Sequence, residues 1–506
     1  MKNLLHFSFS AILAILIFTA NLEAATYYVN AATGSNSNTP AQASNIATPW
    51  LTVQYAIDNP AVMDGDNIVV AVGTYSGFTL TKRLSIIGAW KGSTPTVNTV
   101  FNSTVTLRAA GGSPSQRMML KNLRVSSSAG DGIDIRTGYV TMENVFATSS
   151  QIYGVRLNGD LLNDILMESC NFDGSEIAGI YVPTFATVDG WVMRNSTVRQ
   201  NGTWGIAAFQ RRTNPSQISN VIISHCVFSD NNPSNRQQGH TIYFEKLTNS
   251  TFENISVVMP LTNNWIGIDI NLLSRLDYSD ISILNSRVIR QSPGSGIWIQ
   301  ARNDLFDPPA ALDTVVLRGL TFENCDTNIA FNRQVKNMVV DKCDLSTYSV
   351  YGLVNYTDQG GAINASNNKW QNGGLPDTTV ISGGLLTTGN NIISFMPSTD
   401  GIFVGMGIQG TGIPPNTTVT GKSPNTVSMS NAATIDGFIP QIGFAFNFST
   451  STDLVRTSLN TISASNPLPH SIINQANVSF PNLAAAISAT NSGGTIWNVP
   501  SGVIAG

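Results

Sequence analysis

The amino-acid sequence, 506 residues long, predicts an all-β solenoid in which short strands stack along a single axis. Two observations carry this prediction: one short phrase returns at regular intervals, and each copy alternates between apolar and other residues. Successive copies are spaced by roughly 22 to 34 residues, which is typical of solenoid proteins. The copies begin at Gly132, Gly154, Gly179, Gly205, His240, Gly267, Gly296, Asn328 and Gly352, those at His240 and Asn328 being degenerate.

Each copy has the pattern of a half-buried strand. In the phrase that begins at Gly132, the apolar Ile133 and Ile135 flank a polar residue, which is the period-two pattern of a strand with one buried face. A single such strand cannot bury its inner face alone. Neighbouring copies must therefore stack into one continuous core.

A second column of strands precedes the glycine phrases and supports the same register. One position in this column holds only small or apolar residues, which predicts that it points inward and stacks from coil to coil. The residues at this position are Leu123, Val145, Cys170, Ser196, Cys226, Ile255, Ser286, Leu320 and Cys343.

Together these features carry a family resemblance. Two or three short strands per coil, an Asn-rich turn and a Gly-Ile strand resemble the right-handed parallel β-helix of the pectate-lyase-like superfamily. The resemblance covers about residues 30–370 and implies a right-handed parallel β-helix. It implies no particular reaction, because one fold hosts many functions.

The N-terminus predicts export. Lys2 precedes an apolar run over residues 4–20, which is typical of a secretory signal peptide, so residues 1–25 are assigned to a signal. The alternative is an uncleaved anchor helix. No second apolar run reaches membrane length, so we expect a bacterial protein that is secreted or held at the cell surface, with no membrane span after cleavage.

Residues 26–372 are predicted to form the β-helix domain, which begins with a cap. The segment Thr48–Asp58 is expected to be a short amphipathic helix with Trp50, Val53, Ala56 and Ile57 on one face. It resembles the N-terminal cap of many bacterial secreted β-helix proteins. An open solenoid end exposes apolar surface and strand edges, so a covering element is needed.

Three further segments follow the β-helix domain. Residues 373–447 are expected to form a small β-rich module, because short alternating runs are punctuated by Gly and Pro. Residues 448–477 have the Ser, Asn and Thr content of a linker. Residues 478–506 parallel the N-terminal cap and predict the start of a second β-helix, so that the sequence is a fragment of a longer protein. The alternative is a tail that docks elsewhere.

Composition restricts the partners and the state of the cysteines. Only 11% of the residues are charged and the formal net charge is -4, which argues against nucleic acid and favours a polysaccharide or a cell-surface glycan. Cys170 and Cys226 are separated by two coils, about 10 Å, which is too far for a disulfide. All four cysteines are therefore expected to be buried free thiols, although a pairing of Cys325 with Cys343 stays open.

A ladder of outward side chains follows from the glycine phrases. If Ile133 and Ile135 point inward, the residue between them points outward, and the same register applies to each later copy. Adjacent rungs of a parallel stack are about 5 Å apart. The resulting exposed ladder consists of Asp134, Arg156, Tyr181, Ala207, Tyr243, Asp269, Trp298 and Ala330.

Five ladder residues are predicted to bind a polysaccharide. Aromatic rings pack against sugar faces, while charged groups bind hydroxyls or uronates. The alternative is a solvated outer face whose rings only cover a neighbouring loop. The predicted ligand-binding residues are Asp134, Arg156, Tyr181, Tyr243 and Trp298.

Catalysis is predicted from a pair of carboxylates. Hydrolysis of a glycosidic bond usually needs two carboxylates about 5 to 10 Å apart, and Asp269 with Glu245 could supply them. Asp304 and Asp307, in a long loop, are further candidates. Eliminative cleavage of a uronate needs a base with a cation or a metal, for which Arg302 is the preferred cation. The alternative for each residue is a surface charge without a chemical role.

Four other residues are candidates for the base or the cation of the elimination reaction: Arg156, His240, Arg211 and Arg212. Only two short segments resemble a catalytic motif. The segments Asp131-Gly-Ile-Asp and Gly239-His-Thr resemble two fragments of the pectin-hydrolase signature. The paired aspartates and the Arg-x-Lys element of that signature are missing, which argues against hydrolase activity of that family.

The cofactor prediction is that there is none, with calcium left open. His225 and His240 do not have a recognisable metal-ligand spacing, and no loop matches a known calcium pattern. The favoured function is an exported binding protein with the ladder as its face. The alternative is a polysaccharide lyase or glycoside hydrolase that acts on the same face, and a structural spacer is a third. Whether the protein is an enzyme stays open.

Overall fold

The structure is a computed structural model. It describes residues 24–89, 98–275, 277–291, 294–303, 308–357, 363–366 and 368–370 of the predicted solenoid. Further along the chain it describes residues 379–381, 383–399, 402, 407–440, 442–445, 449–450, 453–454, 472–474, 479–480, 496–498 and 503–505. The predicted signal segment lies almost wholly outside the described residues.

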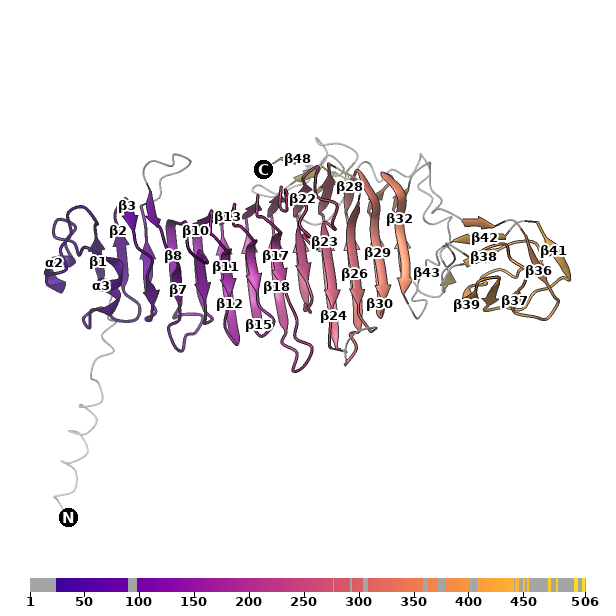
Figure 1. Cartoon of the computed structure of the whole chain (residues 1–506), viewed down its shortest axis with the longest axis horizontal. Coiled ribbons are helices and arrows are strands. Elements are labelled where there is room, and N and C mark those ends of the chain that lie inside the picture. Colours follow the sequence, from indigo (N-terminus) through magenta and orange to yellow (C-terminus); the bar gives the residue numbers. More distant parts are fainter. Residues whose placement is uncertain are drawn as a thin grey trace, which may run out of the picture.

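Two long parallel sheets form the solenoid, and their strands follow the chain order along the long axis of the molecule (Figure 1). Sheet A has 23 strands and sheet B has 11, and each strand pairs in parallel with a strand of the next coil. The predicted parallel stack of coils is therefore confirmed.

The strands of sheet A are β1 (Thr26–Val29), β2 (Asn67–Val70), β3 (Gly73–Tyr75), β5 (Ser85–Ile87), β6 (Thr99–Phe101), β8 (Met118–Val125), β10 (Val140–Thr148), β12 (Leu161–Glu168), β13 (Asn171–Asp173), β15 (Thr187–Arg194), β16 (Thr197–Arg199), β18 (Ile218–Ser224), β19 (Val227–Ser229), β21 (Ser250–Glu253), β22 (Ser256–Met259), β24 (Tyr278–Leu284), β25 (Arg287–Arg290), β27 (Leu312–Arg318), β28 (Thr321–Glu323), β30 (Val335–Asp341), β31 (Asp344–Leu345), β33 (Ile363–Ser366) and β34 (Lys369–Trp370). The strands of sheet B are β4 (Thr79–Leu80), β7 (Val105–Leu107), β9 (Ile133–Ile135), β11 (Tyr153–Leu157), β14 (Ala178–Val182), β17 (Trp204–Ala208), β20 (Ile242–Phe244), β23 (Ile268–Leu272), β26 (Ser295–Ala301), β29 (Cys325–Arg333) and β32 (Tyr348–Thr357).

The predicted inward column of sheet A is buried at every position, from Leu123 to Cys343. The residue before each inward position adopts a left-handed backbone, with φ between 49° and 56° at the five asparagines of this turn. Asparagine tolerates this conformation better than most residues do, because its short polar side chain can form local hydrogen bonds. These asparagines are Asn122, Asn144, Asn195, Asn254 and Asn285. The Asn-rich turn thus bends each coil of sheet A.

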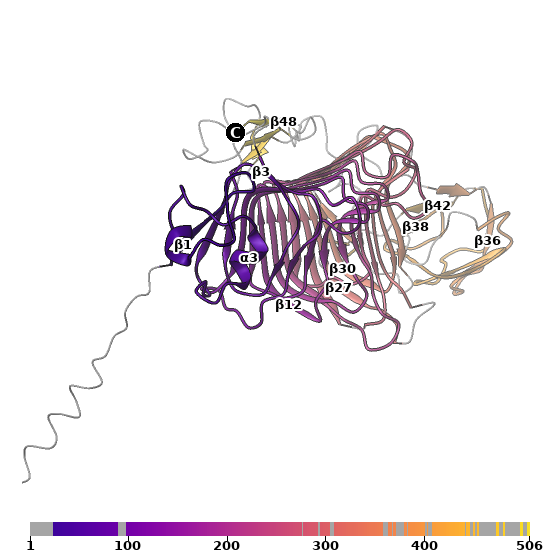
Figure 2. The same ribbon diagram turned by 60° about the vertical axis from the view of Figure 1, so that its left-hand side comes forward.

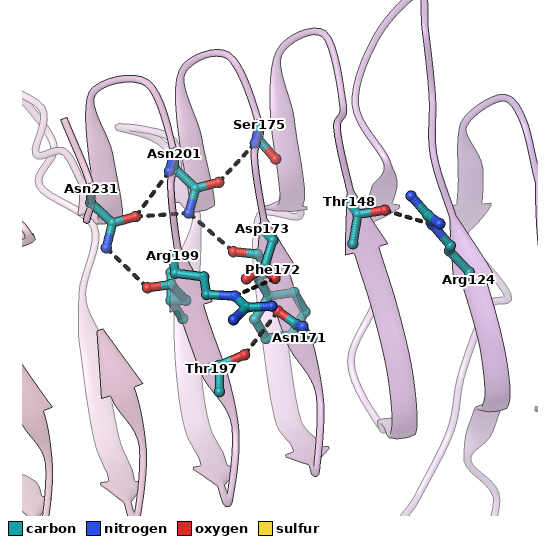
Figure 3. Close-up of polar contacts among 11 residues, drawn as sticks. Arg124, Thr148, Asn171, Phe172, Asp173, Ser175, Thr197, Arg199, Asn201 and Asn231 are labelled. Carbon is teal, nitrogen blue, oxygen red and sulfur yellow. Dashed lines mark hydrogen bonds and ion pairs between the residues drawn. The ribbon is translucent and has the colours of Figure 1, made fainter. Parts of the chain in front are cut away.

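A buried amide ladder supports the turn that leads from sheet A to sheet B (Figure 3). The Asn201 Nδ2 atom donates to the Phe172 carbonyl at 3.0 Å and to Asn231 Oδ1 at 2.9 Å. Asn231 Nδ2 donates to the Val198 carbonyl at 2.9 Å, and the Ser175 amide donates to Asn201 Oδ1 at 2.9 Å. Each coil thereby satisfies polar groups of its neighbour inside the turn.

The N-terminal end of the solenoid carries two short helices, α2 (Pro40–Ala43) and α3 (Val53–Asp58), the second visible at that end in Figure 2. The predicted cap helix is thus shorter than Thr48–Asp58. It begins at Val53 because Thr52 is the N-cap, whose side chain accepts from the Tyr55 amide at 3.3 Å. The predicted apolar face is confirmed, since Val53, Ala56 and Ile57 are buried.

All four cysteines are free and buried, as the sequence predicts. Burial raises the pKa of each thiol to about 12. These thiols are therefore inert core residues.

After the solenoid the strands are antiparallel. The pairings are β35 (Thr379–Ile381) and β38 (Gly407–Gln409) with β42 (Ile442–Ala445), β36 (Gly384–Leu386) with β41 (Gly437–Ile439), β40 (Thr426–Met429) with β37 (Ile392–Ile393) and β39 (Val419–Ser423), and β43 (Ser449–Thr450) with β44 (Asp453–Leu454). A last sheet contains β45 (Ile472–Asn474), β46 (Ser479–Phe480), β47 (Ile496–Asn498) and β48 (Val503–Ala505). The domain limits at residues 25, 372, 447 and 477 stay predictions. Most of the predicted second cap lies outside the described residues.

Among the residues that the structure describes, no helix has the length and apolar character needed to cross a membrane.

Candidate functional site

The predicted ladder is present on the outer face of sheet B. Its residues pair directly from strand to strand, so the register inferred from the glycine phrases is confirmed. We call this set the ladder row. In strand order it consists of Asp134, Arg156, Tyr181, Ala207, Tyr243, Asp269, Trp298 and Ala330.

The ladder row is less exposed than the sequence predicts. Asp134, Tyr243 and Asp269 are only 4%, 7% and 3% exposed, whereas Arg156 and Trp298 are half-buried. The difference arises because neighbouring side chains and turn segments cover the outer face of sheet B. His240, for example, comes from the turn before β20 and contacts both Tyr243 and Asp269.

A second row of outward residues lies two residues after the ladder row in each strand. Of its members, only Glu245 was predicted from the sequence. The backbone pairs Asn271 with Gln300, Gln300 with Asn332, and Asn332 with Tyr356. The same period-two alternation could have identified this row. We call it the outer row, and it consists of Arg136, Asn158, Pro183, Phe209, Glu245, Asn271, Gln300, Asn332 and Tyr356.

Aromatic rings form a continuous run across the middle of this face. The Tyr153 and Tyr181 rings stack with centroids 4.1 Å apart and an interplanar angle of 1°. The Phe209 ring lies 5.8 Å from that of Tyr181 and 5.5 Å from that of Tyr243. The His240 ring then stacks on Tyr243 at 5.1 Å. Such rings offer flat apolar surfaces along the solenoid axis.

Asp269 lies at the centre of the face and is held by His240. The His240 Nε2 atom is 3.3 Å from Asp269 Oδ2, and the Ile266 amide donates to His240 Nδ1 at 3.2 Å. Because Nδ1 accepts a hydrogen bond, the neutral ring carries its proton on Nε2, facing Asp269. Asp269 Oδ1 has no hydrogen-bond partner in the described part of the chain.

Glu245 is the second carboxyl of the centre. The Tyr243 hydroxyl donates to Glu245 Oε1 at 2.8 Å, and Asn271 Nδ2 donates to that hydroxyl at 2.9 Å. The Gln210 amide donates to Glu245 Oε2 at 2.8 Å. Two donors at one carboxylate favour its ionised form, so Glu245 is arranged as a base.

Burial raises the pKa of both carboxyls. Burial, and then the charge of Glu245, raise the pKa of Asp269 to about 8, against the opposing effect of Arg302. Burial also raises the pKa of Glu245, but the Gln210 and Tyr243 hydrogen bonds, with Arg302, oppose the increase. Burial lowers the pKa of His240 to about 3. At neutral pH, Asp269 is therefore an acid beside a neutral imidazole.

The three residues predicted to be catalytic are thus brought together. Asp269 and Glu245 interact electrostatically with each other, and Arg302 acts on both. Neither carboxyl forms a salt bridge to Lys or Arg within the residues that the structure describes. Asp304 and Asp307 lie outside the described residues. Arg211 points elsewhere, with its guanidinium 5.6 Å from the Phe185 ring centroid.

The N-terminal end of the face is charged. The Arg156 guanidinium is 3.6 Å from Asp131, and Arg136 Nε is 2.6 Å from Asp134 Oδ2. These contacts leave further hydrogen-bonding capacity on the same side chains. Along the whole face, the buried atoms without a partner in the described chain are Asp131 Oδ1, Asp134 Oδ1, Arg156 Nε, Asn158 Oδ1, Asp269 Oδ1, Asn271 Oδ1 and Trp298 Nε1.

The face was also compared with the geometry that metal sites require. Across the described residues, no three His, Cys, Asp or Glu side chains gather as metal ligands do. The expectation of no cofactor, with calcium left open, stays a prediction.

Comparison with protein families matches residues 108–271 to the family described as right handed beta helix region. Similar solved structures include the A-module of mannuronan C-5 epimerase AlgE4 from Azotobacter vinelandii, with 16% identity, a TM-score of 0.44, and coverage of 68% of this chain and 99% of that one. An alginate lyase from Paenibacillus sp. str. FPU-7 has 14% identity and a TM-score of 0.37, covering 63% of this chain and 96% of that one. A tailspike protein mutant of E. coli bacteriophage HK620, in complex with a hexasaccharide, has 12% identity and a TM-score of 0.30, covering 76% of this chain and 82% of that one.

A search of curated protein sequences gives no match. The family match and the stacked parallel strands agree with each other, and they confirm the predicted fold class. The chain is a right-handed parallel β-helix protein.

Proposed function

We propose that the outer face of sheet B binds a polysaccharide along the solenoid axis. The observation that carries this proposal is the run of aromatic rings beside buried polar atoms that the described chain leaves without partners. Native proteins rarely leave buried polar atoms unpaired, so each requires an explanation. Sugars have apolar ring faces and many hydroxyl groups, which would satisfy both features at once.

The shape of the face favours an extended polymer over a single sugar. Neighbouring parallel strands lie about 4.8 Å apart, so the ladder row from Asp134 to Ala330 extends over about 34 Å. The predicted signal segment agrees with a polymer outside the cell. We therefore keep the secreted or cell-surface location, with a polysaccharide or cell-surface glycan as partner, as part of this proposal.

A retention screen tests the proposal. The full chain is run by affinity electrophoresis through gels that contain cellulose derivatives, chitosan, polygalacturonate or alginate. At least one polymer should retard the protein, and Tyr181→Ala should reduce the retardation because it removes a stacked ring. Phe146→Ala removes a ring from the outer face of sheet A and serves as the matched control. Absence of retardation by every polymer would favour the structural spacer instead.

Cleavage of the bound glycan is the second candidate function. It is favoured by the pairing of a protonated Asp269 with Glu245 in its hydrogen-bonded, base-like position. Glycoside hydrolysis needs one carboxyl that donates a proton and a second that acts as base or nucleophile, and Asp269 with Glu245 could take these roles. Arg302, close to both, could instead neutralise a substrate carboxylate during elimination.

The products distinguish the two reactions. Hydrolysis produces new reducing ends, whereas elimination also produces unsaturated sugars that absorb in the ultraviolet. Either activity should be lost in Asp269→Asn and in Glu245→Gln. Binding without any product would leave the protein as a binding scaffold.

A further inference from the structure

The C-terminal end of the sheet B face differs in chemistry from the remainder. We propose that it is a subsite for an uncharged sugar unit, recognised through its hydroxyl or acetamido groups, and this inference rests on the polysaccharide-binding function proposed above. We call it the C-terminal subsite. It consists of Asn271, Trp298, Gln300, Asn332 and Tyr356.

The ladder-row and outer-row positions of β26, β29 and β32 carry no charged side chain, and Asp326, at the start of β29, accepts a hydrogen bond from Ser349. The ladder-row positions are Trp298, Ala330 and Val354, and the outer-row positions are Gln300, Asn332 and Tyr356. At the opposite end of the same rows, β9 and β11 present Asp134, Arg136 and Arg156. The two ends of one face therefore suit different ligand units.

The two arginines at the C-terminal ends of β26 and β29 have interactions of their own. Arg302, which follows β26, acts electrostatically on Glu245 and Asp269 at the centre. Arg333 ends β29 and has an interaction of its own. A carboxylate bound at the subsite would lose its hydration without gaining a cation, which is strongly unfavourable.

The polar atoms of the subsite fit neutral hydrogen-bonding groups. Trp298 Nε1 is a buried donor and Asn271 Oδ1 a buried acceptor, and both lack a partner in the described chain. Asn332 Nδ2 donates to Gln300 Oε1 at 3.3 Å, which aligns two amides on neighbouring rungs. A hydroxyl or acetamido group can donate and accept at once, so it can pair with both orphaned atoms.

An aromatic pair supplies the apolar surface that a pyranose ring requires. The Trp298 and Tyr356 rings are 6.1 Å apart with an interplanar angle of 28°. Ala330 pairs with Trp298 on the strand between them, and both rings are partly buried against the core. The three strands extend over about 10 Å, which matches a short oligosaccharide.

The fold itself does not need the indole N–H of Trp298. A buried donor without a partner lowers the stability of a protein, and phenylalanine would keep a smaller aromatic ring without the donor. The loss of the donor and the loss of packed ring atoms oppose each other, so Trp298→Phe should melt close to the wild type. If the donor serves the ligand, the same variant should bind neutral sugars less well.

The test is isothermal titration of the full chain with cellotriose and tri-N-acetylchitotriose as uncharged probes and trigalacturonate as the charged probe. We expect a neutral probe to bind more tightly than trigalacturonate. Trp298→Phe and Gln300→Glu should each weaken that binding about tenfold. Asn171→Asp introduces a charge on the outer face of sheet A, where the new carboxylate can still accept from the Thr197 hydroxyl, and should change that binding by less than twofold.

Several results would overturn the subsite. One is tighter binding of trigalacturonate than of both neutral probes. Another is equal weakening by Asn171→Asp and Gln300→Glu, which would place the neutral sugar elsewhere. If long polymers bind in the retention screen but no trisaccharide binds, the subsite is wrong while the proposed function stands. If no polymer binds, the proposed function itself fails.

Discussion

Sheet A and sheet B are built by the same coils, yet their charged side chains are arranged differently. On sheet A, a carboxylate faces a cation one rung away, as in Lys121 with Glu143 at 2.7 Å and Arg199 with Asp173 at 2.7 Å (Figure 3). On sheet B, such ion pairs lie at the N-terminal end, whereas Asp269 is buried beside a neutral His240. A parallel stack can place a cation one rung from a carboxylate, so a buried carboxyl that contacts only a neutral imidazole points to function rather than to stability.

The largest expected effect concerns turnover at the centre of sheet B. If the protein cleaves its glycan, Asp269→Asn and Glu245→Gln should each lower kcat by at least about 100-fold, because a positioned acid or base contributes that much. Asp173→Asn and Glu143→Gln make the same chemical changes on sheet A and should leave kcat within twofold. Reducing-end and ultraviolet assays measure the effect. Equal losses on both sheets would mean that the substitutions act through folding.

Glycan binding should change less than turnover does, and only when an aromatic ring of sheet B is removed. Tyr181→Ala removes a ring that stacks on Tyr153, so the dissociation constant for the retained polysaccharide should rise about tenfold, equivalent to about 1.4 kcal/mol. Phe146→Ala should change it by less than twofold. Isothermal titration provides the measurement. A larger loss in Phe146→Ala would move the binding face to sheet A.

The pH dependence of stability should reveal the protonated Asp269. Its pKa is about 8 in the folded protein and near 3.8 in the unfolded chain, so the folded state binds the proton more tightly. The resulting stabilisation is complete below the unfolded value and is lost as pH rises through about 8. Each unit of pKa difference corresponds to about 1.4 kcal/mol.

The comparison of wild type with Asp269→Asn isolates this contribution. His240 and Lys246, whose pKa burial lowers to about 3 and about 7, change stability in the opposite direction as pH rises. Both remain in the variant. Denaturant titrations between pH 5 and pH 9 should show wild-type stability falling relative to the variant. A constant difference across that range would contradict a raised pKa at Asp269.

The smallest effect is expected for the ion pairs of sheet A. Lys121 and Glu143 are 34% and 40% exposed, so solvent screens their attraction. Lys121→Ala should lower the free energy of unfolding by less than about 1 kcal/mol and should not change glycan binding. A shift of the urea midpoint that corresponds to more than about 2 kcal/mol would show that these pairs stabilise the solenoid more than solvent exposure allows.

Much of this architecture could be predicted from the sequence because a solenoid repeats one strand pattern. The period-two alternation around Ile133 and Ile135 gave the register of the ladder row over eight strands, which the strand pairing confirms. The inward column from Leu123 to Cys343 followed from the same logic. Regular strands are predictable because each side chain direction depends only on its position in the alternation.

The burial and protonation of the centre could not be predicted in this way. Alternation places Asp269 on the outer face, but turn segments decide whether that face is covered. His240 reaches Asp269 from a turn, and its tautomer depends on the Ile266 amide. The joint action of Asp269, Glu245 and Arg302 was proposed from residue types, and only the coil geometry brings their charges together.

Hydroxyl-radical footprinting distinguishes sheet B from sheet A as the binding face, because it maps which sheet a polysaccharide covers. The full chain is oxidised with and without the polymer that retards it, and the modified side chains are quantified by mass spectrometry. We expect oxidation of Tyr181 and Trp298 to fall severalfold on binding. Oxidation of Ile222 and Val227, which are exposed on sheet A, should not change. Protection of Ile222 and Val227 with unchanged oxidation of Tyr181 and Trp298 would contradict binding on sheet B.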